Sequence, residues 1–129
     1  MNERSVLVNG ISIYSLTNPN LRSFCLSLYV RAGSIFEDSS NNGISHIFEH
    51  VVFRNLKDKY EKFYELIATH GLSLRGCTYK EFVRFTIDGP RHEFDFAVEV
   101  LCGLFDEIKL TSHDFNNEKG RIKAEIREK

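Results

Sequence analysis

The spacing of apolar and polar residues predicts short strands at the start of the chain. Residues 5–8 and 11–15 are rich in β-branched side chains and flank Asn9-Gly10, a dipeptide typical of two-residue hairpin turns. Residues 24–30 have the composition of a third strand. The chain is therefore expected to begin with antiparallel strands.

The middle of the chain has the pattern of two helices. A polar loop at residues 33–42 precedes a predicted helix at about 43–56, for which Asn42 is the expected N-cap. A second helix is predicted at about 58–70, where apolar residues recur every three to four positions. It is expected to end at Gly71, because glycine favours the left-handed conformation that follows many helices.

Two strands and two helices complete the pattern. The second of these strands alternates apolar and polar residues and is expected to end at Gly89-Pro90. The four predicted elements are at residues 73–78, 82–88, 91–104 and 111–129. The order of elements predicts an α+β fold, with a mostly antiparallel sheet and helices packed on it.

Composition narrows the possible functions. The chain has 129 residues and is 42% hydrophobic, which is enough for one domain with a core. Seventeen Lys and Arg balance 18 Asp and Glu, so no basic surface points to a nucleic-acid partner. No apolar run approaches the roughly 18 residues of a membrane span, and the first residues do not resemble a signal peptide. We therefore expect a cytoplasmic protein without a membrane span.

The cysteines and three of the histidines give no sign of a site. Cys25, Cys77 and Cys102 contain no CxxC pair, which argues against a disulfide framework and against a thiolate zinc site. A nucleophilic role for Cys77 is not indicated, because the sequence places no His or Asp beside it. Surface or helix-capping roles are expected for the histidines without partner spacing, His70, His92 and His113.

The segment HIFEH at residues 46–50 places three ionisable side chains in an apolar stretch of predicted helix. His46 and His50 are four positions apart, so they share one helix face and can present two imidazole nitrogens to one cation. Burying these groups together with Glu49 would cost several kcal/mol without partners, and a divalent cation removes that cost. Exposed or hydrogen-bonded side chains are the alternative, because HxxEH arises by chance in roughly one such chain in a hundred.

The last predicted helix offers carboxylates to such a site. Phe115, Glu118, Ile122 and Glu125 follow at spacings of three, four and three, so both glutamates share the face expected to pack inward. They lie two turns apart, about 10.5 Å along the axis, so both cannot bind one ion. A zinc site with two histidines needs one further protein ligand, and this helix supplies two candidates.

These motifs together resemble the M16 family of inverted-motif zinc peptidases, which includes pitrilysin, insulysin and the mitochondrial processing peptidase. The mark of the family is HxxEH followed by a ligand glutamate, here 75 positions beyond His50. EKGRIKAEI is similar to the E-x6-E helix of the family. The family also has a small residue, Gly, Ser and Glu ahead of Gly-x-x-His. This run is similar to Ala32, Gly33, Ser34, Glu37, Gly43 and His46 of this chain. The similarity extends from about residue 5 to the C-terminus and implies the N-terminal part of a processing-peptidase-like catalytic domain.

The resemblance implies a Zn²⁺ site and a reaction. It assigns His46, His50 and Glu125 as zinc ligands, Glu49 as the general base and Glu118 as an acid that supports the catalytic site. Zinc would activate a water molecule, whose proton Glu49 would accept and pass to the leaving amine. The implied substrates are small peptides or precursor segments.

The predicted strand at residues 73–78 departs from the family pattern Gly-x-x-x-Asn-Ala-x-Thr. After Gly71, the chain has the substrate-binding candidates Arg75, Gly76, Cys77 and Thr78. The strand edge could still bind a peptide by main-chain hydrogen bonds. Without the Asn, one means of positioning the scissile bond is missing.

The chain is also shorter than either half of the chamber that the family builds. We therefore expect one shortened M16-type domain, residues 1–129, that works with a second M16-like chain as a hetero- or homo-oligomer. The hypothesis is a zinc metalloendopeptidase subunit that acts on peptides, with no nucleic-acid partner. The alternatives are a catalytically silent zinc-binding or partner-binding subunit and a purely structural fragment.

Overall fold

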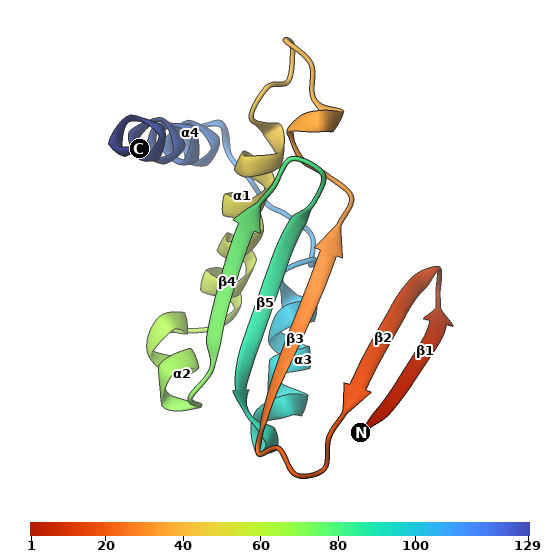
Figure 1. The fold of residues 1–129 in the computed structure, drawn as a ribbon. Coiled ribbons are helices and arrows are strands. Elements are labelled where there is room, and N and C mark those ends of the chain that lie inside the picture. The colour runs from red at the N-terminus through yellow and green to blue at the C-terminus, as the bar shows by residue number, and fades with distance from the viewer.

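In a computed structural model that describes all 129 residues, helices cover one face of a three-stranded antiparallel sheet, and a separate hairpin extends beside it (Figure 1). The larger sheet has the strand order β3-β5-β4, and the hairpin pairs β1 with β2. The strands are β1 (Asn2–Val8), β2 (Ile11–Thr17), β3 (Ser23–Val30), β4 (Ser73–Thr78) and β5 (Val83–Pro90). The helices are α1 (Ile44–Lys59), α2 (Phe63–Thr69), α3 (Phe94–Gly103) and α4 (Ser112–Glu128), with 3-10 turns η1 (Ser34–Phe36) and η2 (Arg91–Glu93).

The α+β class and the order of the elements confirm the sequence-based expectation. Asn9 and Gly10 both have positive φ, at 51° and 79°, in the tight turn between β1 and β2. Gly71 has a φ of 67° and follows His70, the C-cap of α2, as expected for the glycine after a helix C-cap.

Two predicted boundaries are wrong. The helix predicted at 58–70 is instead the end of α1 and the short α2, because Lys62 in the left-handed conformation separates them. β5 does not stop at Gly89-Pro90 but runs through both residues, which oppose Phe24 and Ser23 of β3. Proline is tolerated there because β4 pairs with β5 only as far as Asp88, and the Arg91 N–H, not position 90, donates to Arg22 beside β3.

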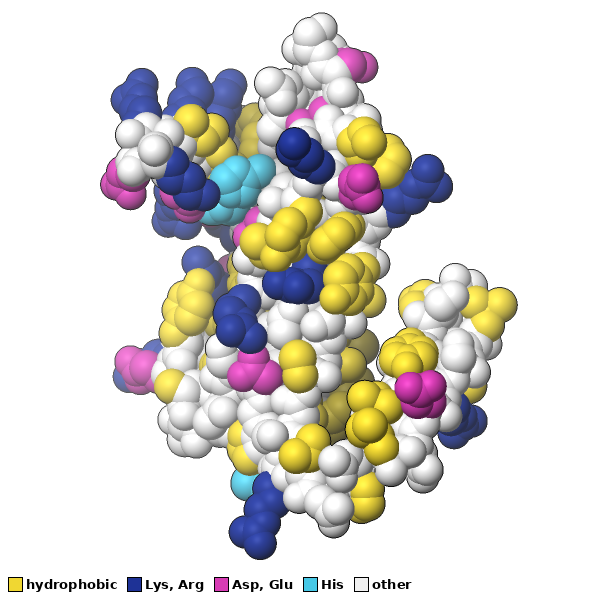
Figure 2. All heavy atoms as spheres, in the orientation of Figure 1, with side chains coloured by type: hydrophobic (Ala, Val, Ile, Leu, Met, Phe, Trp, Pro, Cys, Tyr) yellow, Lys and Arg dark blue, Asp and Glu magenta, His cyan; other side chains and the backbone are white.

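The core lies between the sheet and the helices. Val83, Phe85 and Ile87 of β5 point to the helix side and have no exposed surface, as their alternation predicts. From α1, Val52 and Leu56 pack in the same cluster and anchor the helix that carries the histidines. No helix covers the opposite face of the sheet, and Figure 2 looks onto this face.

The β1–β2 hairpin stands away from the larger sheet (Figure 1). Its apolar side chains Leu7, Tyr14 and Leu16 are each more than half exposed.

No helix of the fold combines the length and the apolar character that crossing a bilayer requires.

Candidate metal centre

The loop before α1 holds the N-terminus of the histidine helix in place. The N-cap is Gly43, in the left-handed conformation at φ 90°, so the prediction of Asn42 as the cap is wrong. The Glu37 carboxylate accepts hydrogen bonds from the backbone N–H groups of Gly43 (2.7 Å) and Ser45 (2.9 Å). A carboxylate at this position satisfies free N–H groups and interacts favourably with the helix dipole.

These contacts also change the acidity of Glu37. Burial alone would raise its pKa, but the hydrogen bonds from Gly43 and Ser45 outweigh burial and lower the pKa below its ordinary value of 4.5. The Ser45 hydroxyl in turn accepts a hydrogen bond from the Gly33 N–H at 2.8 Å. A side chain at Gly33 would collide with the carbonyl oxygens at positions 79 and 80, so glycine is required for this close approach.

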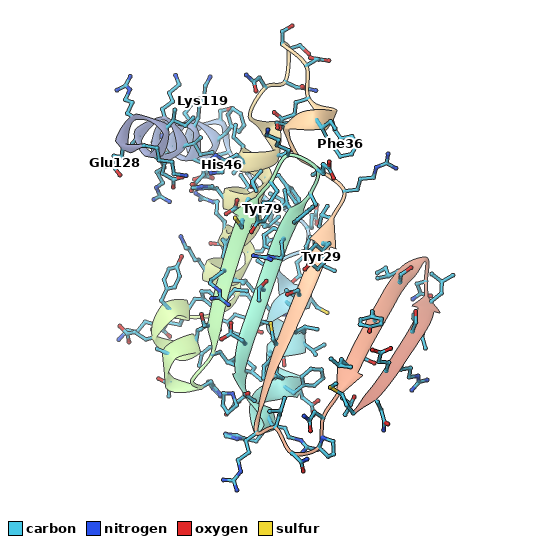
Figure 3. The ribbon with its side chains drawn as sticks, viewed as in Figure 1. Tyr29, Phe36, His46, Tyr79, Lys119 and Glu128 are labelled. Atoms are coloured by element: carbon cyan, nitrogen blue, oxygen red, sulfur yellow. The ribbon has the colours of Figure 1, made fainter.

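Three potential ligand groups converge where α1 meets α4. The Nε2 atoms of His46 and His50 are 3.2 Å apart, and the carboxylate oxygens of Glu125 lie 3.3 Å from the first and 3.5 Å from the second. One ligand atom from each of the three residues falls within 4.8 Å of the others. Figure 3 shows His46 at the junction of the two helices.

The spacing of these atoms suits a zinc ion. Ligand atoms about 2.0–2.1 Å from a tetrahedral zinc ion lie about 3.3–3.4 Å from one another. The separations between His46, His50 and Glu125, 3.2–3.5 Å, are close to this edge length. Two imidazole nitrogens and one carboxylate are also a donor set that zinc accepts in catalytic sites. The residues present therefore fit the metal that the sequence motif implies.

Glu49 lies beside this group but does not belong to it. Its Oε2 accepts a hydrogen bond from the Thr78 hydroxyl at 2.5 Å. On the other side, Gly76 of β4 leaves room for it, since a Cβ there would lie 2.9 Å from Glu49 Oε1. Glu49 is thus held between α1 and β4 with a carboxylate that is not part of the ligand cluster.

Glu118 occupies the buried end of the site. Its side chain is 2% exposed, and its Oε2 is 3.5 Å from His50 Nδ1. Its Oε1 accepts from Arg121 at 3.0 Å and from Arg54 at 3.5 Å, and Arg54 also pairs with Asp114 at 2.7 Å. An acceptor beside Nδ1 favours the tautomer that leaves the Nε2 lone pair of His50 free for a metal.

Sequence reasoning missed Arg54 and Asp114. Arg54 follows His50 by four positions, so it extends the same face of α1 by one turn. Asp114 precedes Glu118 by four positions on α4 and forms a capping box with Thr111. Hydrogen bonds from Thr111 are the main cause of the lowered pKa of Asp114. The four-residue spacings from His50 to Arg54 and from Asp114 to Glu118 were the available signals.

The four substrate-binding candidates divide between the two faces of β4. Gly76 and Thr78 face the cleft that contains the ligand cluster, and Cys77 lines its rim from a position whose side chain shares the open face of the sheet with Arg75. The side chain of Arg75 instead pairs with Asp88 on the face of the sheet that no helix covers.

The cleft around the ligand cluster has a volume of about 780 Å³. The loop before α1 and the β4–β5 turn form its walls, and β4 is an edge strand of the sheet. His70 lies outside the cleft and pairs with Glu93 at 2.8 Å, and the three cysteines are free and exposed, with Cys77 at the rim of the cleft.

Known proteins resemble the chain along almost its whole length. The family model described as insulinase (peptidase family M16) matches residues 12–129. The β subunit of the mitochondrial processing peptidase of Mus musculus is 29% identical over 123 residues, which are 95% of this chain and 25% of that protein. The uncharacterised zinc protease YmxG of Bacillus subtilis is 27% identical over 128 residues, which are 98% of this chain and 31% of that protein.

The fold is matched by a solved structure. The crystal structure of a protease from Helicobacter pylori superposes with a TM-score of 0.85 at 21% identity, over 98% of this chain and 31% of that one. The chain thus spans about a quarter to a third of the length of these proteins. Since the family model covers nearly all of its residues, the chain belongs to the M16 peptidase family.

Proposed function

We propose that the chain is the metal-binding part of a zinc-dependent endopeptidase that hydrolyses peptide bonds in peptides or precursor segments. The observation that carries this proposal is the convergence of His46, His50 and Glu125 beside a carboxylate, Glu49, that lies outside the ligand cluster. Membership in a family of zinc proteases supports it.

His46, His50 and Glu125 would hold the zinc ion. When bound, Zn²⁺ acts as a Lewis acid that activates water and polarises a peptide carbonyl. Glu118 fixes His50 from the opposite side of the ring, at 3.5 Å from Nδ1. The polar contacts of Glu118 with Arg54 and Arg121 hold its carboxylate in place.

Glu49 is the general base in this proposal. A base needs a free carboxylate oxygen within reach of the reacting water. The Thr78 hydroxyl donates to Oε2 of Glu49, whereas Oε1, which lies next to Gly76 of β4, accepts no hydrogen bond in the structure. Glu49 would accept the proton of the attacking water and deliver it to the amine that leaves. The hydrogen bond from the Thr78 hydroxyl orients the carboxylate.

The edge of β4 is the expected position of the substrate. β4 pairs with β5 on one side and has no strand on the other, and it forms one wall of the cleft. An extended peptide can add to such an edge through main-chain hydrogen bonds, which need no particular side chain. This binding mode would place its carbonyl groups beside Glu49.

A second M16-like chain, or further residues of the same protein, would complete the chamber. The related processing peptidase is itself named as a subunit, and the chain matches only a quarter of it. The cytoplasmic location stays a prediction from the sequence. The competing proposal is a subunit that binds zinc or a partner without cleaving peptides, and it is favoured if Glu49 proves dispensable.

Metal analysis and peptide cleavage by three variants test the proposal. The zinc-loaded chain should contain about one Zn²⁺, and both His50→Ala and Glu125→Gln should lose most of it. Glu49→Gln keeps the size of the side chain but removes the base, so zinc should stay while cleavage falls at least about a hundredfold. Cleavage is measured on a mixture of unstructured peptides, alone and with a co-purified partner.

The controls separate metal binding from stability. His113→Ala changes a histidine of α4 outside the ligand cluster and should leave zinc content unchanged. Loss of zinc in Glu49→Gln would make Glu49 a ligand and refute the assigned roles. Retention of zinc in His50→Ala would refute the metal site itself.

A further inference from the structure

The clefts around the metal centre form one continuous surface with unequal charge. The large cleft of about 780 Å³ meets a smaller one of about 270 Å³ along Glu49, His50 and Gly76. Lys80 lines the large cleft near the β4–β5 turn, and Lys57 lines the small one near the end of α1. Figure 2 shows histidine surface bordered by many Lys and Arg side chains on the side of α4.

The acidic groups of these clefts already have partners. Glu37 accepts the two N–H groups at the start of α1, and Glu118 is shared by Arg54 and Arg121. The other two carboxylates, Glu49 and Glu125, lie at the centre where the proposed function places a divalent cation. With that cation bound, Glu37 is the one carboxylate of the two clefts without a cationic partner, against the unpaired lysines Lys57, Lys80 and Lys129.

Lys57 and Lys80 have no acidic partner. Lys57 Nζ lies over the Tyr64 ring, 5.4 Å from its centroid, and neither lysine forms an ion pair in the fold. Their positions bracket the site along β4: the small cleft includes Lys57 together with Leu74, whereas Lys80 lies two residues beyond Thr78. A strand advances about 3.3 Å per residue. For a peptide paired with β4, Lys57 would therefore lie two to three residues from the peptide residue beside Glu49 in one direction, and Lys80 two to three residues from it in the other.

We infer that the substrates are acidic peptides, with Glu or Asp two to three residues away from the scissile bond on both sides. This inference rests on the proposed function and adds the substrate class. One ammonium group at each end of the bound segment would attract these carboxylates, and a peptide with lysines at the same positions would be repelled. The backbone pairing along β4 supplies affinity without discrimination, so the two lysines supply selectivity.

Three labelled decapeptides of one sequence test the inference. They carry Glu, Gln or Lys at the second and third positions on both sides of the central bond. Binding to the zinc-loaded chain is measured by fluorescence anisotropy, and cleavage of the same peptides is followed by mass spectrometry. At low salt the Glu peptide should bind roughly tenfold more tightly than the Gln peptide, and the difference should shrink in 0.5 M salt.

Single variants assign the two ends. Lys57→Gln and Lys80→Gln should each lower the preference about threefold, and each should affect peptides that carry Glu at its own end only. Lys109→Gln is the matched control, because it removes the same charge from the α3–α4 connection, outside both clefts. Removal of zinc should also reduce the preference, since Glu49 and Glu125 then regain their full repulsion of acidic peptides.

The outcomes separate this inference from the proposed function. Cleavage without preference for Glu would overturn the inference and leave the peptidase in place. Preferential binding of the Glu peptide without any cleavage would contradict the peptidase and support the inference. Equal binding of all three peptides, tighter binding of the Lys peptide, or an equal effect of Lys109→Gln would overturn the inference.

Discussion

Replacing Glu118 by Gln removes a buried negative charge from the candidate metal centre while keeping the shape of the side chain. Glu118 is 2% exposed and makes contacts with three donors at 3.0–3.5 Å: Arg121, Arg54 and His50. Gln keeps one acceptor oxygen but turns an NH₂ group towards one of these donors. The variant should therefore lose stability and weaken the metal site at the same time.

The size of both effects follows from the surroundings of Glu118. Breaking a buried ion pair by removing one partner costs about 3–5 kcal/mol when the remaining charge is cut off from water. The side chains of Arg54 and Arg121 are 28% and 61% exposed, so water can replace part of the lost interaction. We expect a loss of about 1–3 kcal/mol in the free energy of unfolding. Loss of the acceptor beside His50 Nδ1 should weaken zinc binding about 10- to 100-fold.

Two assays separate these effects. Urea denaturation of the metal-free chain measures stability, and competition with a chromogenic chelator measures zinc affinity. Glu128→Gln is the control, because Glu128 ends α4 and forms no ion pair. If Glu118→Gln behaved like Glu128→Gln in both assays, the carboxylate would neither stabilise α4 nor orient His50. A larger loss of zinc in Glu118→Gln than in Glu125→Gln would transfer the ligand role to Glu118.

Two further predictions concern the ends of the helices that carry the ligands. Glu37 has a lowered pKa, so its contribution to stability is present above pH 4.5 and is lost as the pH falls through its lower folded-state pKa. Glu37→Gln should therefore cost about 1 kcal/mol at pH 7 and less at pH 3; thermal melts of both proteins at the two pH values check this, and an equal difference at both would contradict it. Thr111→Ala removes the capping box of α4 and should cost about 1 kcal/mol in urea denaturation, whereas Ser112→Ala should be nearly neutral.

The parts of the fold that depend on local pattern could be predicted from the sequence. The alternation of Val83, Phe85 and Ile87 identified the buried face of β5, and Asn9-Gly10 identified the hairpin turn. The four-residue spacing of His46 and His50 placed both imidazoles on one side of α1. Each of these features needs only the geometry of one strand, turn or helix.

The features that depend on how distant elements meet could not be predicted in this way. Glu37 replaces Asn42 at the start of α1 because the loop folds back on the helix, which no local pattern describes. The stripe on α4 was expected to face inward, yet Glu118 is buried while the side chain of Glu125 is 45% exposed. The two differ because Glu118 packs against His50 and Arg54 of α1, whereas Glu125 lines the open cleft.

The attachment of α4 suggests that a metal bound at the candidate site would stabilise the fold as well as supply chemistry. Ile122 is the buried apolar residue of this 17-residue helix, and Phe115 and Ile126 are exposed. Burying one such side chain contributes only about 1.5–3 kcal/mol, so the polar ties of Glu118 and Asp114 to Arg54 must hold much of the helix in place. Glu125 lies two turns beyond Glu118 on α4. A zinc ion bound by Glu125, His46 and His50 would attach the C-terminal half of α4 to α1. A metal present at a hundred times its dissociation constant would add about 2.7 kcal/mol to the folded state, as much as the apolar contact itself.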